Sequence, residues 1–338
     1  MEFSQSVKDY DIVGIGVSTL DLLTIVKDFS CEESVQKAID AKFQGGGPVA
    51  TALVAAAKLG AKVAMIDSVG DDLIGQSILE EFNKYGVITK HIQITPGKTS
   101  SIASIWIREG DGQRSIVYRP GNSPELTEDC ISLETIKKAK ILHLNGRHLQ
   151  CCLKACSLAK ENGVKISFDG GGGRYRSELD PLIPFIDICI VARDFAEKYT
   201  KTNNVQNAAQ CFLDQGCELV VITDGENGSD IFSKYEENFH QPAFKLEKVV
   251  DTTGCGDVYH GVFLFSLISG LTLAQLYPKG LDPGEVSSPR ERASLTLRES
   301  AKIATAAAAI NSQRIGGRGM LSTMPEIIDF MQKNDFAP

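Results

Sequence analysis

One short stretch, DTTGCGD at residues 251–257, carries the residue types best suited to chemistry. A strand-like run over 245–250 precedes it and an apolar segment over 258–268 follows, so the order predicts a strand, a tight turn and a helix. Two glycines leave room where the backbone must bend, and a helix start presents unpaired amides that stabilise an anion. Asp257, at the head of that helix, could accept a proton from a hydroxyl group while those amides stabilise a phosphoryl group in transfer.

Capping is the simpler interpretation of Asp257, because a lone aspartate after a glycine usually only caps a helix. Here Asp257 stands among two glycines, two threonines and a second acid, Asp251. These neighbours favour the catalytic interpretation over simple capping.

A second distinctive stretch, GGGPVATALVAAAKLGAKVAMIDSVGDDLIG, runs over residues 45–75. Together the two stretches resemble the signatures of the PfkB (ribokinase-like) family of sugar and nucleoside kinases, and the resemblance covers roughly residues 10–333. In motif detail the chain is most similar to ribokinase-like and sulfofructose-kinase-like members. The family's DTxGAGD is matched apart from Cys255, which stands in place of alanine and which we expect to pack without a redox role.

The resemblance implies a catalytic role for the first stretch, with Asp257 as the catalytic base. The family's anion hole falls on four consecutive residues: Gly254, Cys255, Gly256 and Asp257. ATP and Mg²⁺ are the implied cofactors. Asp251 and the carbonyl of Thr253 resemble ligands of a monovalent cation, so K⁺ is a further candidate cofactor.

The resemblance also indicates an acceptor site. Gly45 and Gly46 match the glycine pair that lets the acceptor's hydroxyls approach the backbone, and Asp21 matches the aspartate that binds two sugar hydroxyls. The asparagine that the family carries five residues after the first glycine is replaced here by Ala50. We hypothesise that the acceptor has its own negative group, bound by Arg147 as in sulfofructose-kinase-like members. A surface arginine without a ligand is the alternative interpretation of Arg147.

Three residues match the family's nucleotide contacts: Thr223, Gly225 and Gly256. The late stretch SQRIGGRG at 312–319 resembles the loop that closes the cation and adenine region. Most relatives carry an Asn-x-x-Glu motif associated with magnesium and phosphate, whereas residues 192–195 are Ala-Arg-Asp-Phe here. The protein ligands of Mg²⁺ therefore stay unassigned, with Asp194 or Glu197 as nearby acids.

Two other glycine-rich segments are weaker signals. The GIG at 14–16 lacks the third glycine of a dinucleotide fingerprint, and Asp21 follows too early to bind a ribose. The four glycines at 170–173 are not followed by the Lys-Ser or Lys-Thr of a phosphate loop. In the family this place is a strand-end loop before an arginine, here Arg174.

The elements around these motifs predict an α/β fold. Segments rich in Val, Ile and Leu alternate with amphipathic stretches, which is typical of a mainly parallel sheet covered by helices on both faces. The predicted strands are 11–17, 62–69, 141–145, 165–169, 186–192 and 218–223. A helix is expected over 48–59, with Pro48 in its first turn and Gly60 as a left-handed terminator.

Alternating apolar and polar residues over 102–108 and 114–119 predict a hairpin outside the buried sheet. A lid and a solvated edge hairpin are both open from the pattern alone. The resemblance implies a ribokinase-like three-layer α/β/α sandwich with a central mainly parallel sheet and a small β-lid, forming one domain over all 338 residues. The lid segments would span about 18–45 and 97–122, and the segment 277–292, rich in proline and glycine, is expected to be a flexible insertion.

Composition limits the partners and the setting. A net charge of −8 gives no broad cationic surface, so no nucleic-acid partner is expected. No apolar run approaches the roughly 20 residues that span a bilayer, so no membrane partner is expected. The polar start over 1–8 and nine scattered cysteines fit a reducing, cytoplasmic setting. Because lids of this family often pair between subunits, a homodimer is a candidate assembly.

The leading hypothesis is therefore ATP-dependent phosphorylation of a hydroxyl group on a sugar, a polyol or a sugar-like small molecule. A nucleoside kinase is the alternative within the enzyme class. A catalytically silent relative that binds a sugar or a nucleotide is the alternative outside it, because the Asn-x-x-Glu pattern is missing although Asp257 is present.

Overall fold

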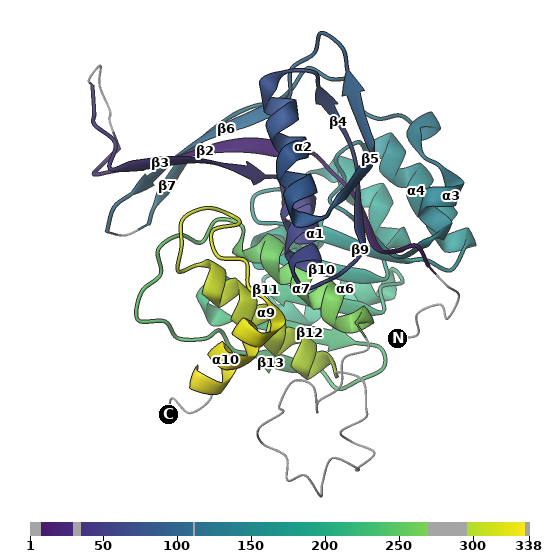
Figure 1. Ribbon diagram of the computed structural model, residues 1–338. Coiled ribbons are helices and arrows are strands. Elements are labelled where there is room, and N and C mark those ends of the chain that lie inside the picture. The colour runs from purple at the N-terminus through teal and green to yellow at the C-terminus, as the bar shows by residue number, and fades with distance from the viewer. Residues whose placement is uncertain (1–7, 30–34, 111, 270–295, 335–338) are drawn as a thin grey trace, which may run out of the picture.

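The computed structural model describes residues 8–29, 35–110, 112–269 and 296–334. Figure 1 shows a main body built around a large sheet, with a smaller sheet that projects from one side. Among these residues no helix is both long and apolar enough to cross a membrane. The insertion expected at 277–292 lies outside the described residues.

A nine-stranded sheet forms the centre of the molecule, in the order β13-β12-β11-β10-β9-β8-β1-β4-β5. The strands β12 and β13 are antiparallel at one edge, and the other strands pair in parallel. All six predicted strands belong to this sheet, with bounds that differ by a residue or two. The strands are β1 Tyr10–Ile15, β4 Val63–Gly70, β5 Ile88–Thr95, β8 Ala139–Leu144, β9 Lys165–Gly170, β10 Ile188–Ala192, β11 Leu219–Thr223, β12 Ser229–Ser233 and β13 Phe239–Gln241.

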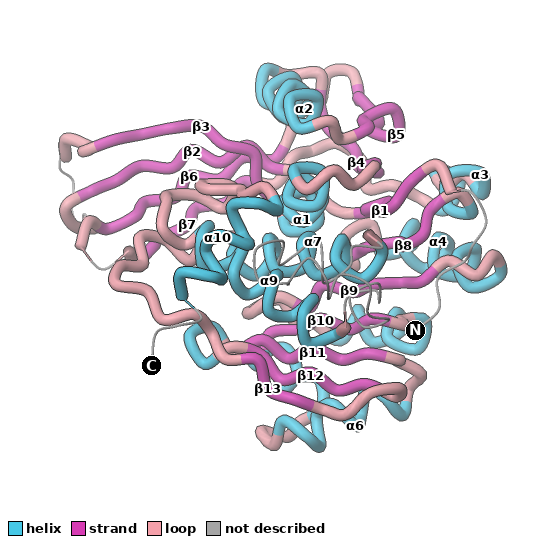
Figure 2. Tube along the Cα trace, turned by 60° about the horizontal axis from the view of Figure 1, so that its bottom comes forward, coloured by secondary structure: helices cyan, strands magenta, loops and turns pink. Residues whose placement is uncertain are grey.

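Helices cover both faces of this sheet and form the outer layers of an α/β/α sandwich (Figure 2). One face packs against α1, α2, α7, α9 and α10, and the other packs against α3, α4, α5 and α6. The helices are α1 Pro48–Lys58, α2 Leu73–Tyr85, α3 Leu133–Lys137, α4 Leu149–Glu161, α5 Arg193–Thr200, α6 Val205–Asp214, α7 Cys255–Ile268, α9 Leu297–Asn311 and α10 Met324–Asn334. The predicted helix over 48–59 is confirmed as α1, with Pro48 in its first turn and Gly60 at a φ of 102°.

A separate four-stranded sheet has the order β3-β2-β6-β7. Its strands are β2 Thr19–Val26, β3 Asp40–Gly46, β6 Ser101–Arg108 and β7 Arg114–Arg119. The predicted hairpin is confirmed as the antiparallel pair β6 and β7. One face of this sheet buries an apolar cluster of Leu23, Ala103, Ile105 and Ile107. We call this element the small sheet; its action as a lid stays a prediction.

The strand predicted over 245–250 is wrong. Residues 242–253 are irregular, and the amides of Val250 and Asp251 donate to the carbonyl of Ser312 at 2.8 and 3.1 Å. The chain leaves the sheet after β13, because Pro242 follows and lacks the N–H that would extend the ladder. The helix predicted from residue 258 begins three residues earlier, as α7.

Candidate active site

Asp257 lies in the first turn of α7. Gly254 precedes that helix with a φ of 69°, and a Cβ there would overlap the Cα of Gly317, so only glycine fits this turn. Gly256 is exposed, and a Cβ there would meet none of the described atoms. The first amides of a helix have no intrahelical partners. The Asp257 side chain is 16% exposed and Gly256 beside it is exposed, so the first turn of α7 is open to solvent.

Arg174, in the loop after β9, connects Asp257 with a second carboxylate. Its Nη2 lies 3.6 Å from Oδ1 of Asp257, and its Nη1 lies 3.3 Å from Oδ2 of the buried Asp169. Burial raises the pKa of Asp257; the Arg174 cation opposes this rise, and the Asp169 charge adds to it. A carboxyl group with a raised pKa is a stronger proton acceptor than an ordinary aspartate.

Two buried histidines, His143 and His260, lie near Asp169. Nε2 of His260 is 3.6 Å from Oδ1 of Asp169, and Nδ1 of His143 is 3.2 Å from the Ser167 hydroxyl. Burial lowers the pKa of His143 to about 3 and that of His260 to about 4, so both rings are neutral near pH 7. One ligand atom from each of His143, Asp169 and His260 falls within 4.8 Å of the others. The Arg174 guanidinium already neutralises Asp169, so Coulomb repulsion disfavours a metal cation here.

Asp251, at the start of the same turn, is 1% exposed. Its Oδ1 accepts from the amide and the hydroxyl of Thr253 at 2.8 and 2.6 Å, and its Oδ2 accepts from the amide of Gly316 at 2.8 Å. Three donors thus stabilise the buried carboxylate of Asp251. The donor from Gly316 also connects this turn to the loop after α9. Carboxylate and carbonyl oxygens are the hard ligands that alkali cations also prefer, so these residues fit a monovalent cation.

On the acceptor side, Asp21 lies on β2 directly against Gly46. Its Oδ1 accepts from the Thr19 hydroxyl at 2.7 Å, and a Cβ on Gly46 would overlap the Asp21 carboxylate. Burial raises the pKa of Asp21, Thr19 lowers it, and the charge of Asp257 adds to the rise. The fold therefore brings the expected acceptor residues and the expected base into one electrostatic environment.

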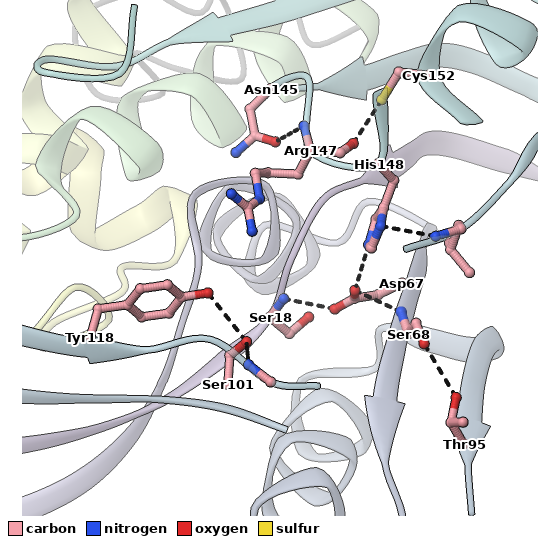
Figure 3. Close-up of polar contacts among 12 residues, drawn as sticks. Ser18, Asp67, Ser68, Thr95, Ser101, Tyr118, Asn145, Arg147, His148 and Cys152 are labelled. Atoms are coloured by element: carbon pink, nitrogen blue, oxygen red, sulfur yellow. Dashed lines mark hydrogen bonds and ion pairs between the residues drawn. The ribbon is translucent and has the colours of Figure 1, made fainter. Parts of the chain in front are cut away.

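Arg147 follows β8 and is half-buried. Its amide donates to Oδ1 of Asn145 at 3.2 Å, and its carbonyl accepts from the thiol of Cys152 at 3.0 Å. Figure 3 shows the Arg147 guanidinium directed away from His148 and toward the side where Asn145 and Tyr118 lie. Its guanidinium forms no ion pair among the described residues, which leaves the charge open to a ligand.

His148 and Asp67 form a buried pair that the sequence motifs did not indicate (Figure 3). Nδ1 of His148 accepts from the amide of Leu126 at 3.1 Å, so Nε2 carries the hydrogen and donates to Oδ1 of Asp67 at 3.1 Å. Oδ2 of Asp67 accepts from the amide of Ser18, just before β2, at 2.7 Å. This pair therefore connects the loop that carries Arg147 to Ser18, the residue directly before the small sheet.

Two of the three expected nucleotide residues, Thr223 and Gly225, lie at the carboxyl end of β11, and the third, Gly256, lies in the first turn of α7. Thr223 is the last residue of this strand and donates to the carbonyl of Val191 at 3.4 Å. Gly225 follows with a φ of 55°. Parallel strands end at one edge, so these residues share an edge with Asp169 on β9, and ligands of open α/β sheets bind at such an edge.

The acids named for magnesium both have partners within the protein. Oδ2 of Asp194 accepts from the amide of Gly173 at 2.7 Å, and its Oδ1 pairs with Lys198 at 2.7 Å. Glu197 pairs with Arg193 at 3.0 Å. Neither acid is therefore assigned to Mg²⁺.

The hairpin of β6 and β7 in the small sheet contacts the turn before α7. Arg114 on β7 donates from Nη1 to the hydroxyl of Thr252 at 2.8 Å. Beside this contact lies a cavity of about 290 Å³, lined by residues 112–114 and 249–252. The small sheet thus contacts the turn before α7.

Comparison with known proteins relates this arrangement to one family. A model described as pfkB family carbohydrate kinase matches residues 10–324. A 5-dehydro-2-deoxygluconokinase of Listeria monocytogenes is 30% identical over 284 residues, covering 78% of this chain and 86% of the relative. A deoxyribokinase of Salmonella typhi is 26% identical over 262 residues, covering 75% and 84%.

Solved structures share the fold. The ribokinase of Arabidopsis thaliana, complexed with ribose and ATP, superposes with a TM-score of 0.75 at 21% identity, covering 96% of this chain and 99% of that one. The ribokinase of Thermotoga maritima gives a TM-score of 0.75 at 24% identity with the same coverage. The ribokinase-like α/β/α sandwich expected from the sequence is confirmed by these similarities.

Proposed function

Because the chain belongs to the pfkB family of carbohydrate kinases, we propose that it transfers the terminal phosphoryl group of ATP to a hydroxyl group of a sugar or a sugar-like small molecule. The observation that carries this proposal is Asp257, partly exposed in the first turn of α7 and within the electrostatic reach of Asp21. The relatives named ribokinase, deoxyribokinase and 5-dehydro-2-deoxygluconokinase support a sugar as the acceptor.

In the proposed reaction Asp257 removes the proton from the acceptor hydroxyl. The acceptor oxygen forms a bond to the terminal phosphorus, and the bond from that phosphorus to the bridging oxygen breaks, so ADP leaves. The amides of 254–257 and the Arg174 guanidinium would stabilise the negative charge of the phosphoryl group in transfer. Mg²⁺, when bound with ATP, supplies further charge neutralisation on the phosphates.

The acceptor would lie between the small sheet and the end of β8. Asp21 can accept from two hydroxyl groups, and Gly46 lies directly against its carboxylate. The half-buried Arg147 supports an acceptor that carries its own negative group, because its guanidinium is open to a ligand. On the nucleotide side, Thr223, Gly225 and Gly256 would contact ATP.

Asp251 and the carbonyl of Thr253 would hold a monovalent cation such as K⁺. The support is the burial of Asp251 and its place next to the turn that bears the anion-binding amides. A cation there would add to the three hydrogen bonds and the nearby Lys42 charge that already stabilise the buried carboxylate. The eight described cysteines are free thiols, which fits the reducing cytoplasm as the place of the reaction.

A phosphorylation panel tests this function. Purified protein is given ATP and Mg²⁺ with neutral sugars, sugar acids or nucleosides, with and without K⁺, and ADP formation is measured. We expect ADP formation that depends on a sugar or a sugar acid. Preference for a nucleoside would indicate a nucleoside kinase, and ATP binding without turnover on any acceptor would indicate a catalytically silent protein.

Asp257→Asn supplies the matched control for that panel. An amide cannot take the hydroxyl proton, so kcat should fall at least about 10²-fold. The ATP affinity should change little, because the backbone amides of the turn stay in place. A variant that keeps nearly full kcat on the preferred acceptor would refute Asp257 as the base.

A further inference from the structure

Arg318 is a buried arginine in the loop between α9 and α10, with a side chain that is 2% exposed. Its Nη1 pairs with Oε1 of Glu81 at 3.0 Å, and its Nη2 donates to the carbonyl of Gly46 at 3.1 Å. Its Nε donates to the hydroxyl of Thr51 at 3.2 Å. A buried guanidinium is costly unless its donors are paired, so this set of partners fixes the side chain in one position.

Glu81 on α2 extends this contact to Gly45, the first residue of the glycine pair. While its Oε1 pairs with Arg318, its Oε2 accepts from the amide of Gly45. A Cβ on Gly45 would overlap both the Arg318 guanidinium and the Glu81 carboxylate. The ion pair thus fills the space above Gly45 and binds both the N–H of Gly45 and the carbonyl of Gly46.

The loop that carries Arg318 also packs against residues 251–254, the turn that precedes α7 and that we call the catalytic turn. Its neighbour Gly316 donates from the amide to Oδ2 of Asp251 at 2.8 Å, and Gly317 occupies the space that a Cβ on Gly254 would need. The amide of Arg318 donates to Oε1 of Gln44 at 3.0 Å. Three consecutive residues, 316–318, therefore lie between the turn that leads to Asp257 and the strand β3 that ends in the glycine pair.

We propose that Arg318, acting through Glu81, is a positioning residue for the acceptor. The ion pair holds the peptide of Gly45 and Gly46, and with it Asp21, at a fixed distance from the catalytic turn. Such control matters because a displacement of about 1 Å between reacting groups can cost about 10² in rate. This inference rests on the proposed sugar kinase function, since the acceptor is what Gly45, Gly46 and Asp21 would bind.

Two variants separate positioning from stability. Arg318→Met alone leaves the partly buried Glu81 without its partner and can unfold the protein. The double variant Arg318→Met with Glu81→Met keeps the volume and leaves no unpaired charge, so it should stay folded. Glu81→Gln keeps an acceptor for the Gly45 amide and weakens only the pairing with Arg318. Lys333→Met, which removes an exposed i,i+4 ion pair on α10, is the control for charge removal.

The first measurement compares KM values on D-ribose, 2-deoxy-D-ribose and 5-dehydro-2-deoxy-D-gluconate, using whichever the wild type phosphorylates best. We expect the double variant to raise the acceptor KM about tenfold and Glu81→Gln to raise it less, with the KM for ATP changed less than about twofold. Lys333→Met should match the wild type. A folded double variant with an unchanged acceptor KM, or with an equal rise in both KM values, would overturn the proposal.

The second measurement is amide hydrogen exchange of the peptide that contains Gly45, made without any ligand. The Gly45 amide should exchange at least about tenfold faster in the double variant, because its acceptor is gone. Unchanged protection would also overturn the proposal. A wild type that phosphorylates none of the three sugars would instead count against the proposed function, and the exchange result would still decide whether the pair holds Gly45.

Discussion

Asp257 acts in an environment that three other residues set. Arg174 contributes a cation at 3.6 Å, Asp169 adds a negative charge behind it, and the neutral His260 packs against Asp169. The sequence could propose Asp257 as the base because its motif is contiguous, with glycines and acids inside seven residues. The supporting residues could not be predicted to meet, because Asp169 on β9 and Asp257 on α7 are 88 positions apart in the sequence.

Activity should fall toward acid pH through protonation of Asp257. The base works only when deprotonated, and burial together with Asp169 raises its pKa. The acid limb of the kcat profile should therefore lie at a higher pH than an ordinary aspartate would give. Asp169→Asn removes one of the raising charges and should shift that limb to lower pH.

The pH–rate profiles of the two proteins and of a control measure this shift. Asp230 lies on β12, and its Oδ1 pairs with Nδ1 of His240 at 2.9 Å, so Asp230→Asn is a suitable control and should leave the limb in place. A limb that moves to higher pH in Asp169→Asn would contradict the electrostatic role of Asp169.

Arg147 should determine the charge of the acceptor. Arg147→Ala is expected to raise KM about tenfold or more for sugar acids, because a charge-assisted hydrogen bond is lost, while KM for neutral sugars changes little. Steady-state kinetics on matched acid and neutral sugars check this, with the exposed Lys154→Ala on α4 as control. If KM for sugar acids stays at the wild-type value, Arg147 is a surface residue without a ligand.

At the scale of elements, apolar runs located six of the seven parallel strands and missed β5, the parallel strand at one edge of the sheet, because only one of its residues is buried. The central strands β1, β4, β8, β9, β10 and β11 are buried on both faces, so each carries a continuous apolar run. The short edge strands β12 and β13 lack this signal and were missed. The segment 245–250 has strand-forming residues but no neighbouring strand, so its backbone pairs with Ser312.

The start of α7 depends on a glycine that no other residue can replace. Gly254→Ala should destabilise the protein by roughly 2–4 kcal/mol, because a left-handed alanine costs about 1–2 kcal/mol and its Cβ would also push against Gly317. Urea unfolding measures the change.

Gly163→Ala isolates the backbone cost in the same experiment. Gly163 also has a positive φ, of 63°, but a Cβ there would meet nothing within 4 Å among the described atoms. It should lose only the roughly 1–2 kcal/mol of the left-handed conformation. Equal losses in the two variants would show that the contact with Gly317 is not tight.

At the scale of the whole molecule, two different sequence patterns predicted the two parts. Strands that alternate with helices indicated the α/β/α body, and apolar residues that alternate with polar ones indicated strands outside it, in the small sheet. The sequence did not predict that the loop 316–318 connects the two parts. This connection depends on contacts between residues more than 200 positions apart, such as Arg318 with Gly46. Long-range polar contacts of this kind leave no periodic signal in a sequence.

The outer face of the small sheet suits pairing with a second copy of the chain. Phe43, Leu22, Ser104 and Val117 are successive cross-strand partners, so they share one face, opposite the buried row that contains Leu23 and Ile105. Phe43 and Val117 are 64% and 71% exposed on that face. Exposed apolar residues gathered on one face mark an interaction surface, which supports the proposed homodimer.

A dimer that pairs through this face should be converted into a monomer by Val117→Asp, since an unpaired carboxylate in an apolar interface costs several kcal/mol. Light scattering coupled to size-exclusion chromatography would measure the mass of each variant. Leu73→Asp, at a position 79% exposed on α2 in the main body, should leave the mass unchanged. A wild type that is monomeric at all concentrations, or a Val117→Asp variant that stays dimeric, would contradict pairing through this face.

Because the opposite face of the same strands carries Asp21, pairing here would also hold the acceptor residues in place, so the monomeric variant should show a higher acceptor KM.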